Sequence, residues 1–183
     1  MNQDLKAILV DEDEIQQIVK RISKQITEDY KGRDTKLLLL GILKGSVVFM
    51  ADLMRNIDLP FEIDFMKVSS YGAGSKSSGN LKITLDIKRD DLSNIDILIV
   101  EDIIDSGRTL SNLTEYLKEK GANSVSTVTL LDKPSRREVE YNATYTGKTI
   151  PDEFVVGYGL DYAERYRALP YVGVLKPEVY GAK

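Results

Sequence analysis

Hydrophobic residues in this chain follow two patterns, short continuous runs and repeats at helical spacing. Branched apolar runs at 37–43 and 97–100 are typical of strands that are buried on both faces of a sheet. Apolar residues three and four positions apart within 15–26, and again within 110–117, predict amphipathic helices. The same criteria give a list of further elements: a helix over 47–54, and strands over 61–68, 124–131 and the start of 154–162. This alternation predicts an α/β fold with a central, mostly parallel sheet flanked by helices.

Glycine and serine are concentrated in one segment, 69–79, which shows no apolar periodicity and is therefore expected to be a mobile loop. The residues after it, 81–87, alternate between apolar and polar, so the loop is predicted to join a long hairpin. A linker between domains is the alternative. With 183 residues, the chain fits one domain with a sizeable core.

The most informative stretch, 97–113, reads as a strand, an acidic turn at Glu101 and Asp102, a hydroxyl- and glycine-containing loop over 105–109, and a helix. In an open parallel sheet, ligands bind beyond the carboxyl ends of strands, and a helix start offers unpaired N–H groups to a phosphate. The two carboxylates could accept hydrogen bonds from hydroxyl groups or hold a hydrated Mg²⁺. A phosphorylated sugar would fit both halves, although an isolated Asp-Ser-Gly is more typical of an ordinary capped turn.

Composition narrows the possible chemistry. The chain has no cysteine and no histidine, so acid–base groups must be Asp, Glu, Lys or Tyr, and a metal site should be oxygen-liganded and suited to Mg²⁺. A net charge of −4 argues against a nucleic-acid-binding surface. The sequence contains no apolar run of about 18 residues and no signal-peptide pattern, so we expect no membrane span and a cytoplasmic enzyme.

The segment VEDIIDSGRTL at 100–110 resembles the phosphoribosyl-pyrophosphate signature of type I phosphoribosyltransferases, and its details are similar to the hypoxanthine-guanine branch. The resemblance continues through LLGILKGSVVFMADL, SSYG, LLDKPSRR and PDEFVVGYGLDYAERYR. It implies the type I phosphoribosyltransferase fold over 1–183 as a single domain. A small hood subdomain would combine the N-terminal segment with the region after about residue 150, and 69–79 would form a flexible lid.

The resemblance also implies roles for residues that match the family motifs. Those expected to hold the phosphoribosyl group are Glu101, Asp102, Asp105, Ser106, Gly107, Arg108 and Thr109. Those expected at the pyrophosphate are Lys44, Gly45 and Arg167, covered by the lid residues Ser70 and Tyr71. Those expected at the purine are Lys133, Phe154, Val155 and Asp161. Mg²⁺ would be held by Glu101 and Asp102, and a second Mg²⁺ by Asp161 through water.

The implied reaction transfers the phosphoribosyl group from phosphoribosyl pyrophosphate to N9 of hypoxanthine or guanine. Asp105 is the candidate general acid–base, accepting or sharing the proton at purine N7. Both substrates are small molecules, and relatives commonly form homodimers or homotetramers. Mammalian relatives carry lysine where this chain has Glu153, which leaves the preference among 6-oxopurines open. The alternatives are a xanthine-, orotate- or adenine-specific enzyme, and a ligand sensor that regulates nucleic acid.

Overall fold

A computed structural model describes residues 2–70 and 81–181 of the chain. The predicted lid residue Tyr71 lies outside this range, as does the side chain of Ser70. The centre of the molecule is a six-stranded sheet in the order β4-β3-β2-β5-β6-β7, in which only β4 runs antiparallel to its neighbour among the described strands. The bounds of these strands are β2 Lys36–Ile42, β3 Glu62–Ser70, β4 Leu81–Leu85, β5 Ile95–Ile104, β6 Ser124–Asp132 and β7 Tyr145–Thr149. The predicted hairpin is confirmed by the pairing of Ser70 with Leu81.

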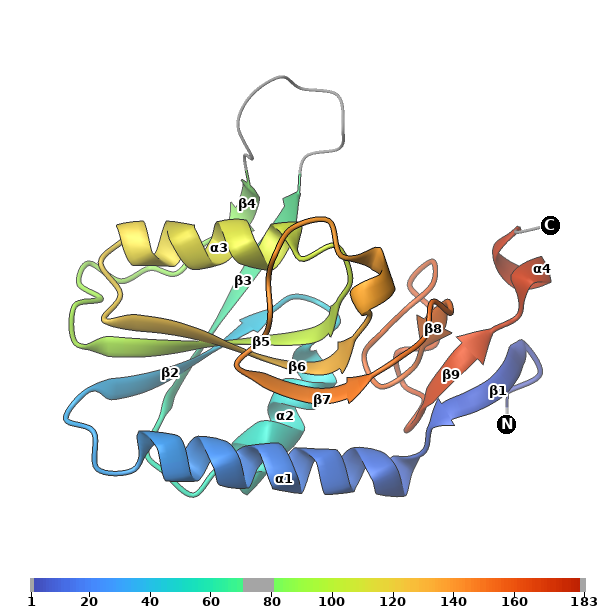
Figure 1. The fold of residues 1–183 in the computed structure, drawn as a ribbon, viewed down its shortest axis with the longest axis horizontal. Helices are drawn as coiled ribbons and strands as arrows, with labels where there is room; N and C mark the ends of the chain where they lie inside the picture. The colour runs from blue at the N-terminus through green and yellow to red at the C-terminus, as the bar shows by residue number, and fades with distance from the viewer. Residues whose placement is uncertain (1, 71–80, 182–183) are drawn as a thin grey trace.

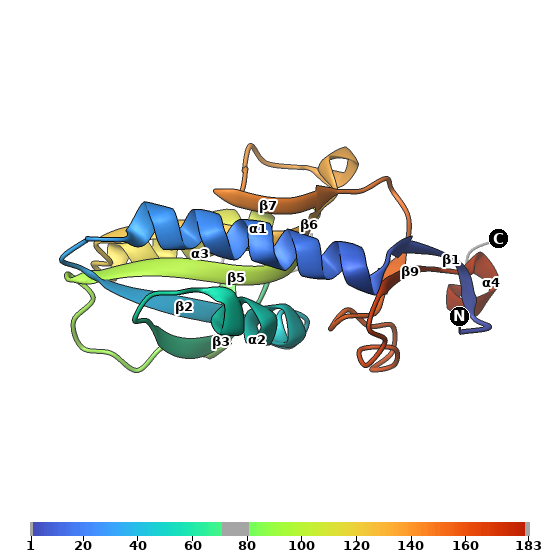
Figure 2. The ribbon, with the colours of Figure 1, turned by 90° about the horizontal axis from the view of Figure 1, so that it is seen from below.

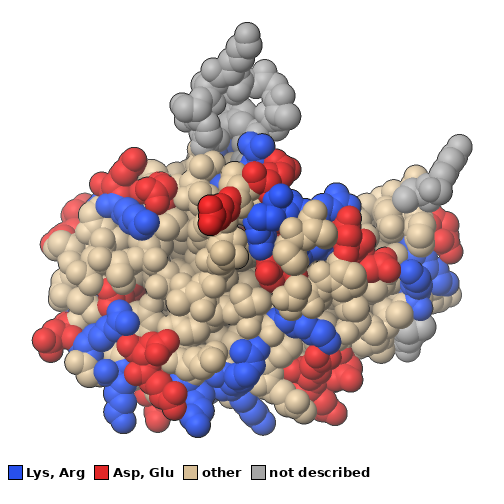
Figure 3. Space-filling model, in the orientation of Figure 1, with Lys and Arg blue, Asp and Glu red and all other residues tan. Residues whose placement is uncertain are grey.

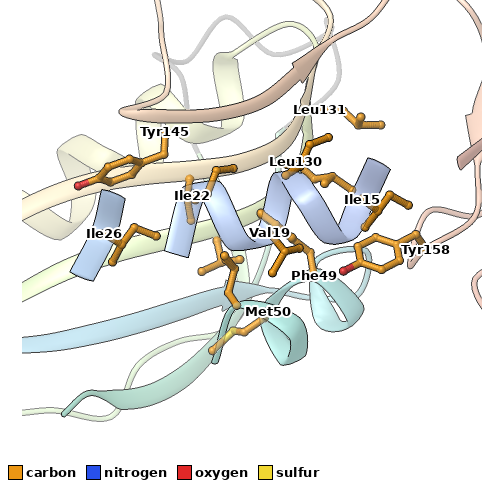
Figure 4. Close-up of a cluster of buried hydrophobic side chains, with 14 of the residues drawn as sticks. Ile15, Val19, Ile22, Ile26, Phe49, Met50, Leu130, Leu131, Tyr145 and Tyr158 are labelled. Carbon is orange, nitrogen blue, oxygen red and sulfur yellow. The ribbon is translucent and has the colours of Figure 1, made fainter. Parts of the chain in front are cut away.

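Helices cover both faces of this sheet, as predicted (Figure 1 and Figure 2). Helices α1 (Glu12–Tyr30) and α2 (Val47–Asn56) lie on one face, and α3 (Arg108–Glu119) lies on the other. The buried stripe of α1 packs against Phe49 and Met50 of α2 and against β6 and β7 (Figure 4). Asp11 caps the helix, since its side chain accepts a hydrogen bond from the Glu14 N–H at 2.8 Å, and the other acidic residues before this stripe lie in the first turn, where the helix dipole favours them.

A second, antiparallel sheet lies at one end of the molecule (Figure 1) and is called the hood below. Its strands, in the order β1-β9-β8, are β1 Leu5–Val10, β9 Val172–Leu175 and β8 Val155–Val156. The short helices η1 (Pro134–Arg136) and α4 (Pro177–Tyr180) complete the described elements. No helix in the described ranges is both long enough and apolar enough to cross a membrane.

Strand β5 differs from its prediction, because it continues through Glu101 and Asp102 to Ile104. The prediction of an acidic turn is therefore wrong. Ladder pairs with β6 extend past the end of β2, with Glu101 opposite Thr129 and Ile104 opposite Asp132. The two carboxylates consequently lie on strand backbone that is held by pairing with β6, beyond the last residue of β5 that pairs with β2.

Candidate active site

A cavity of about 270 Å³ opens at the carboxyl ends of β2 and β5. It brings together the following residues: Ile42, Leu43, Gly45, Val68, Glu101, Asp102, Ile103, Ile104, Asp105, Ser106, Gly107, Thr109 and Leu110. Most of the predicted phosphoribosyl-binding residues therefore line one space. The exception is Arg108, whose exposed side chain forms an ion pair with Glu138 instead.

The two carboxylates of β5 are partly buried beside each other. The Asp102 N–H donates to Glu101 Oε1 at 3.2 Å, and the Ile103 N–H donates to Asp102 Oδ1 at 2.9 Å. Burial raises the pKa of Glu101 well above its usual range, and the neighbouring Asp102 charge adds to the rise. Burial also raises the pKa of Asp102. The pair would thus be stabilised by a positive charge placed in the cavity.

Gly45 lies directly against Asp102. A Cβ at position 45 would be 1.6 Å from Asp102 Oδ2, a contact that no side chain can make. The peptide bond between Leu43 and Lys44, one residue before the bond that joins Lys44 to Gly45, is cis. The absence of a side chain at Gly45 thus lets the loop after β2 reach the carboxylates of β5.

The donor set fits Mg²⁺ only in combination with a substrate. In the described ranges, no group of three or more His, Cys, Asp or Glu side chains could hold a metal ion. Mg²⁺ in proteins is usually bound by one or two carboxylates, several waters and substrate phosphates. Glu101 and Asp102 match that pattern.

The loop from Asp105 to Gly107 leads into the N-terminus of α3. Gly107 adopts a left-handed conformation with φ of 77°, and the helix begins at the next residue. The first N–H groups of any helix lack partners within the helix and suit an anion. Because Gly107 and Thr109 line the cavity, this helix start opens into it.

The connection between β6 and β7 holds this loop in place, which the sequence interpretation missed. Arg137 donates from Nη1 to the Asp105 carbonyl at 2.6 Å and pairs through Nη2 with Asp132 at the end of β6. The N–H of Glu138 donates to the Ser106 carbonyl at 3.0 Å. Figure 3 shows basic side chains gathered over η1, which is part of this connection, with acidic ones beside them. The second arginine of LLDKPSRR, Arg137, was the sequence feature that could have indicated this contact.

The predicted pyrophosphate residues Lys44 and Arg167 meet at Glu164, which sequence reasoning also missed. Lys44 Nζ lies 2.9 Å from Glu164 Oε2, and Arg167 Nη2 lies 3.3 Å from the same oxygen. Lys44 is the main cause of a lowered Glu164 pKa. Arg167 also pairs with Asp161 at 2.8 Å. Both cations are therefore already neutralised in this arrangement.

The predicted purine residues lie near the hood, outside the lining of the cavity. Lys133 Nζ donates to the Glu153 carbonyl at 2.7 Å, and the Glu153 side chain pairs with Lys6 at 3.1 Å. The Phe154 ring stacks on Tyr180 with centroids 4.7 Å apart, a partner that sequence reasoning did not identify. Val155 is buried in β8.

Asp161 uses both carboxylate oxygens within the protein. Oδ1 pairs with Arg167, and Oδ2 accepts a hydrogen bond from the Glu164 N–H at 2.9 Å. A cation could approach this carboxylate through a bridging water without breaking either contact.

The model of the phosphoribosyl transferase domain family matches residues 8–163 of this chain. The chain belongs to the phosphoribosyltransferase family. The hypoxanthine-guanine phosphoribosyltransferase of Staphylococcus aureus strain Mu50 is 53% identical over 180 residues, covering 98% of this chain and 99% of the relative. A crystal structure of a hypoxanthine phosphoribosyltransferase from Staphylococcus aureus matches with a TM-score of 0.90 at 53% identity, covering 97% and 95% of the two chains.

A third relative, the bifunctional protein TilS/HprT of Listeria monocytogenes serotype 4b, is 52% identical over 180 residues. That match covers 98% of this chain but 27% of the relative, so this chain spans about a quarter of that protein's length. The predicted fold and the resemblance to the hypoxanthine-guanine branch are both confirmed.

Proposed function

We propose that this phosphoribosyltransferase transfers the phosphoribosyl group of phosphoribosyl pyrophosphate to N9 of hypoxanthine or guanine, yielding IMP or GMP and pyrophosphate. The observation that supports this most is the cavity that joins the Glu101–Asp102 carboxylates to the loop at the start of α3. A ligand with a phosphate at one end and a sugar diol at the other matches those two chemistries. The 53% identity to the Staphylococcus aureus enzyme supports the same reaction.

The 5′-phosphate would bind at 105–109, with the hydroxyls of Ser106 and Thr109 and the N–H groups of the first turn of α3 as donors. Arg108 would contribute its backbone N–H and a general positive field. Glu101 and Asp102 would accept from the ribose hydroxyls or hold Mg²⁺. When bound, Mg²⁺ would offset the charge that develops on the leaving pyrophosphate.

Pyrophosphate would occupy the space beside Lys44, Gly45 and Arg167. Both cations pair with Glu164, whose side chain is 66% exposed. Pyrophosphate carries more negative charge than one carboxylate, so it would compete for both cations and leave Glu164 free to turn to solvent. Asp161 would stay paired with Arg167 and reach a second Mg²⁺ through water.

The purine would lie toward the hood, with Lys133 donating to O6 and the Phe154 ring stacking on the base. Stacking of this kind contributes about 1–3 kcal/mol per base. Backbone groups of Val155 and Asp161 would read the edge of the base. Since Tyr180 covers one face of the Phe154 ring, the base would use the opposite face.

No covalent nucleophile is required, which suits a chain without Cys or His. Asp105 would accept or share the proton at purine N7, and its exposed carboxylate is tethered through its backbone by Arg137. Orientation of two bound substrates can supply about 7–11 kcal/mol of the barrier. Positioning by 105–109 and charge stabilisation at the pyrophosphate would therefore carry most of the catalysis.

The test is turnover with Mg²⁺, phosphoribosyl pyrophosphate and each of five bases: hypoxanthine, guanine, xanthine, adenine and orotate. We expect nucleotide formation with the 6-oxopurines alone, and the ranking among them resolves the question raised by Glu153. Turnover of adenine or orotate at a comparable rate would refute the proposed role of Lys133. The same proposal includes a cytoplasmic, single-domain enzyme that assembles as a homodimer or homotetramer, which sedimentation analysis can measure.

A further inference from the structure

A buried hydrogen bond connects α2 to the turn that precedes the predicted pyrophosphate arginine. The hydroxyl of Tyr158 donates to Asp52 Oδ2, and the two residues are only 4% and 7% exposed. Gln16 of α1 approaches the same oxygen at 3.5 Å, and Arg55 pairs with the other carboxylate oxygen. Figure 4 shows the Tyr158 ring lying among Ile15 of α1 and Phe49 of α2. Burial, followed by the bond to Asp52, raises the pKa of Tyr158, so its hydroxyl stays protonated as a donor.

Each end of this contact leads directly to a different part of the pyrophosphate site. Asp52 lies on α2, which begins at Val47, immediately after Lys44-Gly45-Ser46. Tyr158 precedes Gly159, whose carbonyl accepts from Arg167 Nη1 at 2.7 Å and whose N–H donates to the Arg167 carbonyl at 3.0 Å. One hydrogen bond therefore ties the element that follows Lys44 to the turn that holds Arg167.

The two parts also touch through their backbones. A Cβ at Gly159 would lie 2.1 Å from the Gly45 carbonyl oxygen, and Gly45 in turn lies against Asp102. Any movement of the Gly159 turn would thus be transmitted to the loop that contacts the carboxylates of β5.

The turn has a backbone conformation that must be held by its surroundings. Gly157, Tyr158 and Gly159 have φ values of 101°, 50° and 101°, and a tyrosine rarely adopts the left-handed region. Such residues persist where neighbouring contacts over-determine the local structure, and they occur often at functional sites. Here the side chain of the strained residue itself makes the anchoring bond to Asp52.

We propose that the Tyr158–Asp52 hydrogen bond is a positioning contact that fixes Arg167 and the Lys44–Gly45 loop at the separation needed to bind pyrophosphate. This inference rests on the proposed function and deepens it. Neither residue touches substrate; both act through Gly159 and α2. The contact should therefore affect phosphoribosyl pyrophosphate and leave the purine contacts of Lys133 and Phe154 unchanged.

Tyr158→Phe removes the hydroxyl and keeps the ring. We expect the KM and the calorimetric Kd for phosphoribosyl pyrophosphate to rise by about tenfold, as for loss of a hydrogen bond to a charged group. The KM for hypoxanthine should stay within twofold of the wild-type value. Asp52→Ala should reproduce this split, whereas Asp52→Asn keeps an acceptor for the hydroxyl and should hold the KM for phosphoribosyl pyrophosphate within threefold.

Tyr145→Phe is the matched control, because Tyr145 is 7% exposed and its hydroxyl donates to Asp29 Oδ2 at 2.7 Å, between β7 and α1. It should lower Tm about as much as Tyr158→Phe and leave both KM values unchanged. If Tyr158→Phe lowers Tm with both KM values unchanged, or raises both equally, the contact is merely structural and the inference is wrong. Wild-type turnover is measured first: its absence refutes the proposed function and this inference together, whereas active wild type with unaltered variant constants refutes the inference alone.

Discussion

Gly45→Ala is a sharp test of how the site is assembled. The added Cβ would lie 1.6 Å from Asp102 Oδ2 and 2.5 Å from its Cγ, whereas ordinary van der Waals contact begins at 3.4 Å. Asp102 lies on β5, which stays paired with β6 as far as Ile104, so the backbone of β5 cannot easily move away from the added Cβ. Either the carboxylate rotates away from the cavity or the loop after β2 withdraws, and both displace a predicted substrate contact by more than 1 Å.

A misplacement of about 1 Å in a positioning group can cost about 100-fold in rate, or about 2.7 kcal/mol of transition-state stabilisation. We therefore expect Gly45→Ala to lower kcat/KM for phosphoribosyl pyrophosphate by about 100-fold. Overpacking should also lower the free energy of unfolding by about 1–3 kcal/mol. Steady-state kinetics and denaturant unfolding measure the two effects separately.

Gly121→Ala provides the control for a general glycine effect. Gly121 has φ of 93°, and a Cβ there would meet nothing within 4 Å. The substitution should cost about 1 kcal/mol of stability through its backbone conformation and leave kcat/KM unchanged. If Gly45→Ala keeps kcat/KM within threefold of wild type, the close approach of Gly45 to Asp102 does not position the carboxylate, and the reasoning is refuted.

Three further predictions concern Asp105, Lys133 and Asp96. Asp105→Asn should lower kcat by at least about 100-fold while the Kd for phosphoribosyl pyrophosphate changes less than threefold; equal losses would make Asp105 a structural residue. Lys133→Ala should lower kcat/KM for hypoxanthine by about 10- to 100-fold, and unchanged hypoxanthine kinetics would contradict the contact to O6. Asp96 is 1% exposed and accepts from Thr35, Ser124, Asn123 and Arg33, and these bonds outweigh its burial and lower its pKa to about 2. Because the pKa of Asp96 is lower in the folded state than in the unfolded state, its ionised form should contribute about 2 kcal/mol to the free energy of unfolding above pH 4. This contribution should be lost as the pH falls toward 2. Asp96→Asn should abolish this pH dependence in acid unfolding titrations.

Elements governed by local periodicity could be predicted from the sequence. Helix α1 begins after the Asp11 cap and buries the apolar stripe that defined it, and β2 and β6 lie where their apolar runs indicated. The type of fold followed from the same alternation. Strand β5 was underestimated because its last residues, including Glu101 and Asp102, are held by pairing with β6, which is a nonlocal contact.

In the candidate site, too, local features could be predicted from the sequence and nonlocal contacts could not. Residues 101–109 are contiguous in the chain, so a single sequence motif identified them, and all of them except Arg108 line one cavity. Two contacts between distant segments left no local pattern, Glu164 on Lys44 and Tyr180 on Phe154. For Arg137 on the Asp105 carbonyl, the sequence offered the second arginine of LLDKPSRR but not its partner. The functional roles assigned to Gly45, Asp105 and Lys133 remain predictions that the variants above can test.

The most direct measurement is a product analysis of the wild-type protein mixed with Mg²⁺, phosphoribosyl pyrophosphate and hypoxanthine. The proposed function predicts IMP and pyrophosphate in equal amounts, with neither formed when phosphoribosyl pyrophosphate or the base is omitted. Binding of phosphoribosyl pyrophosphate without nucleotide formation from hypoxanthine, guanine or any other base tested would contradict it and favour a ligand sensor instead.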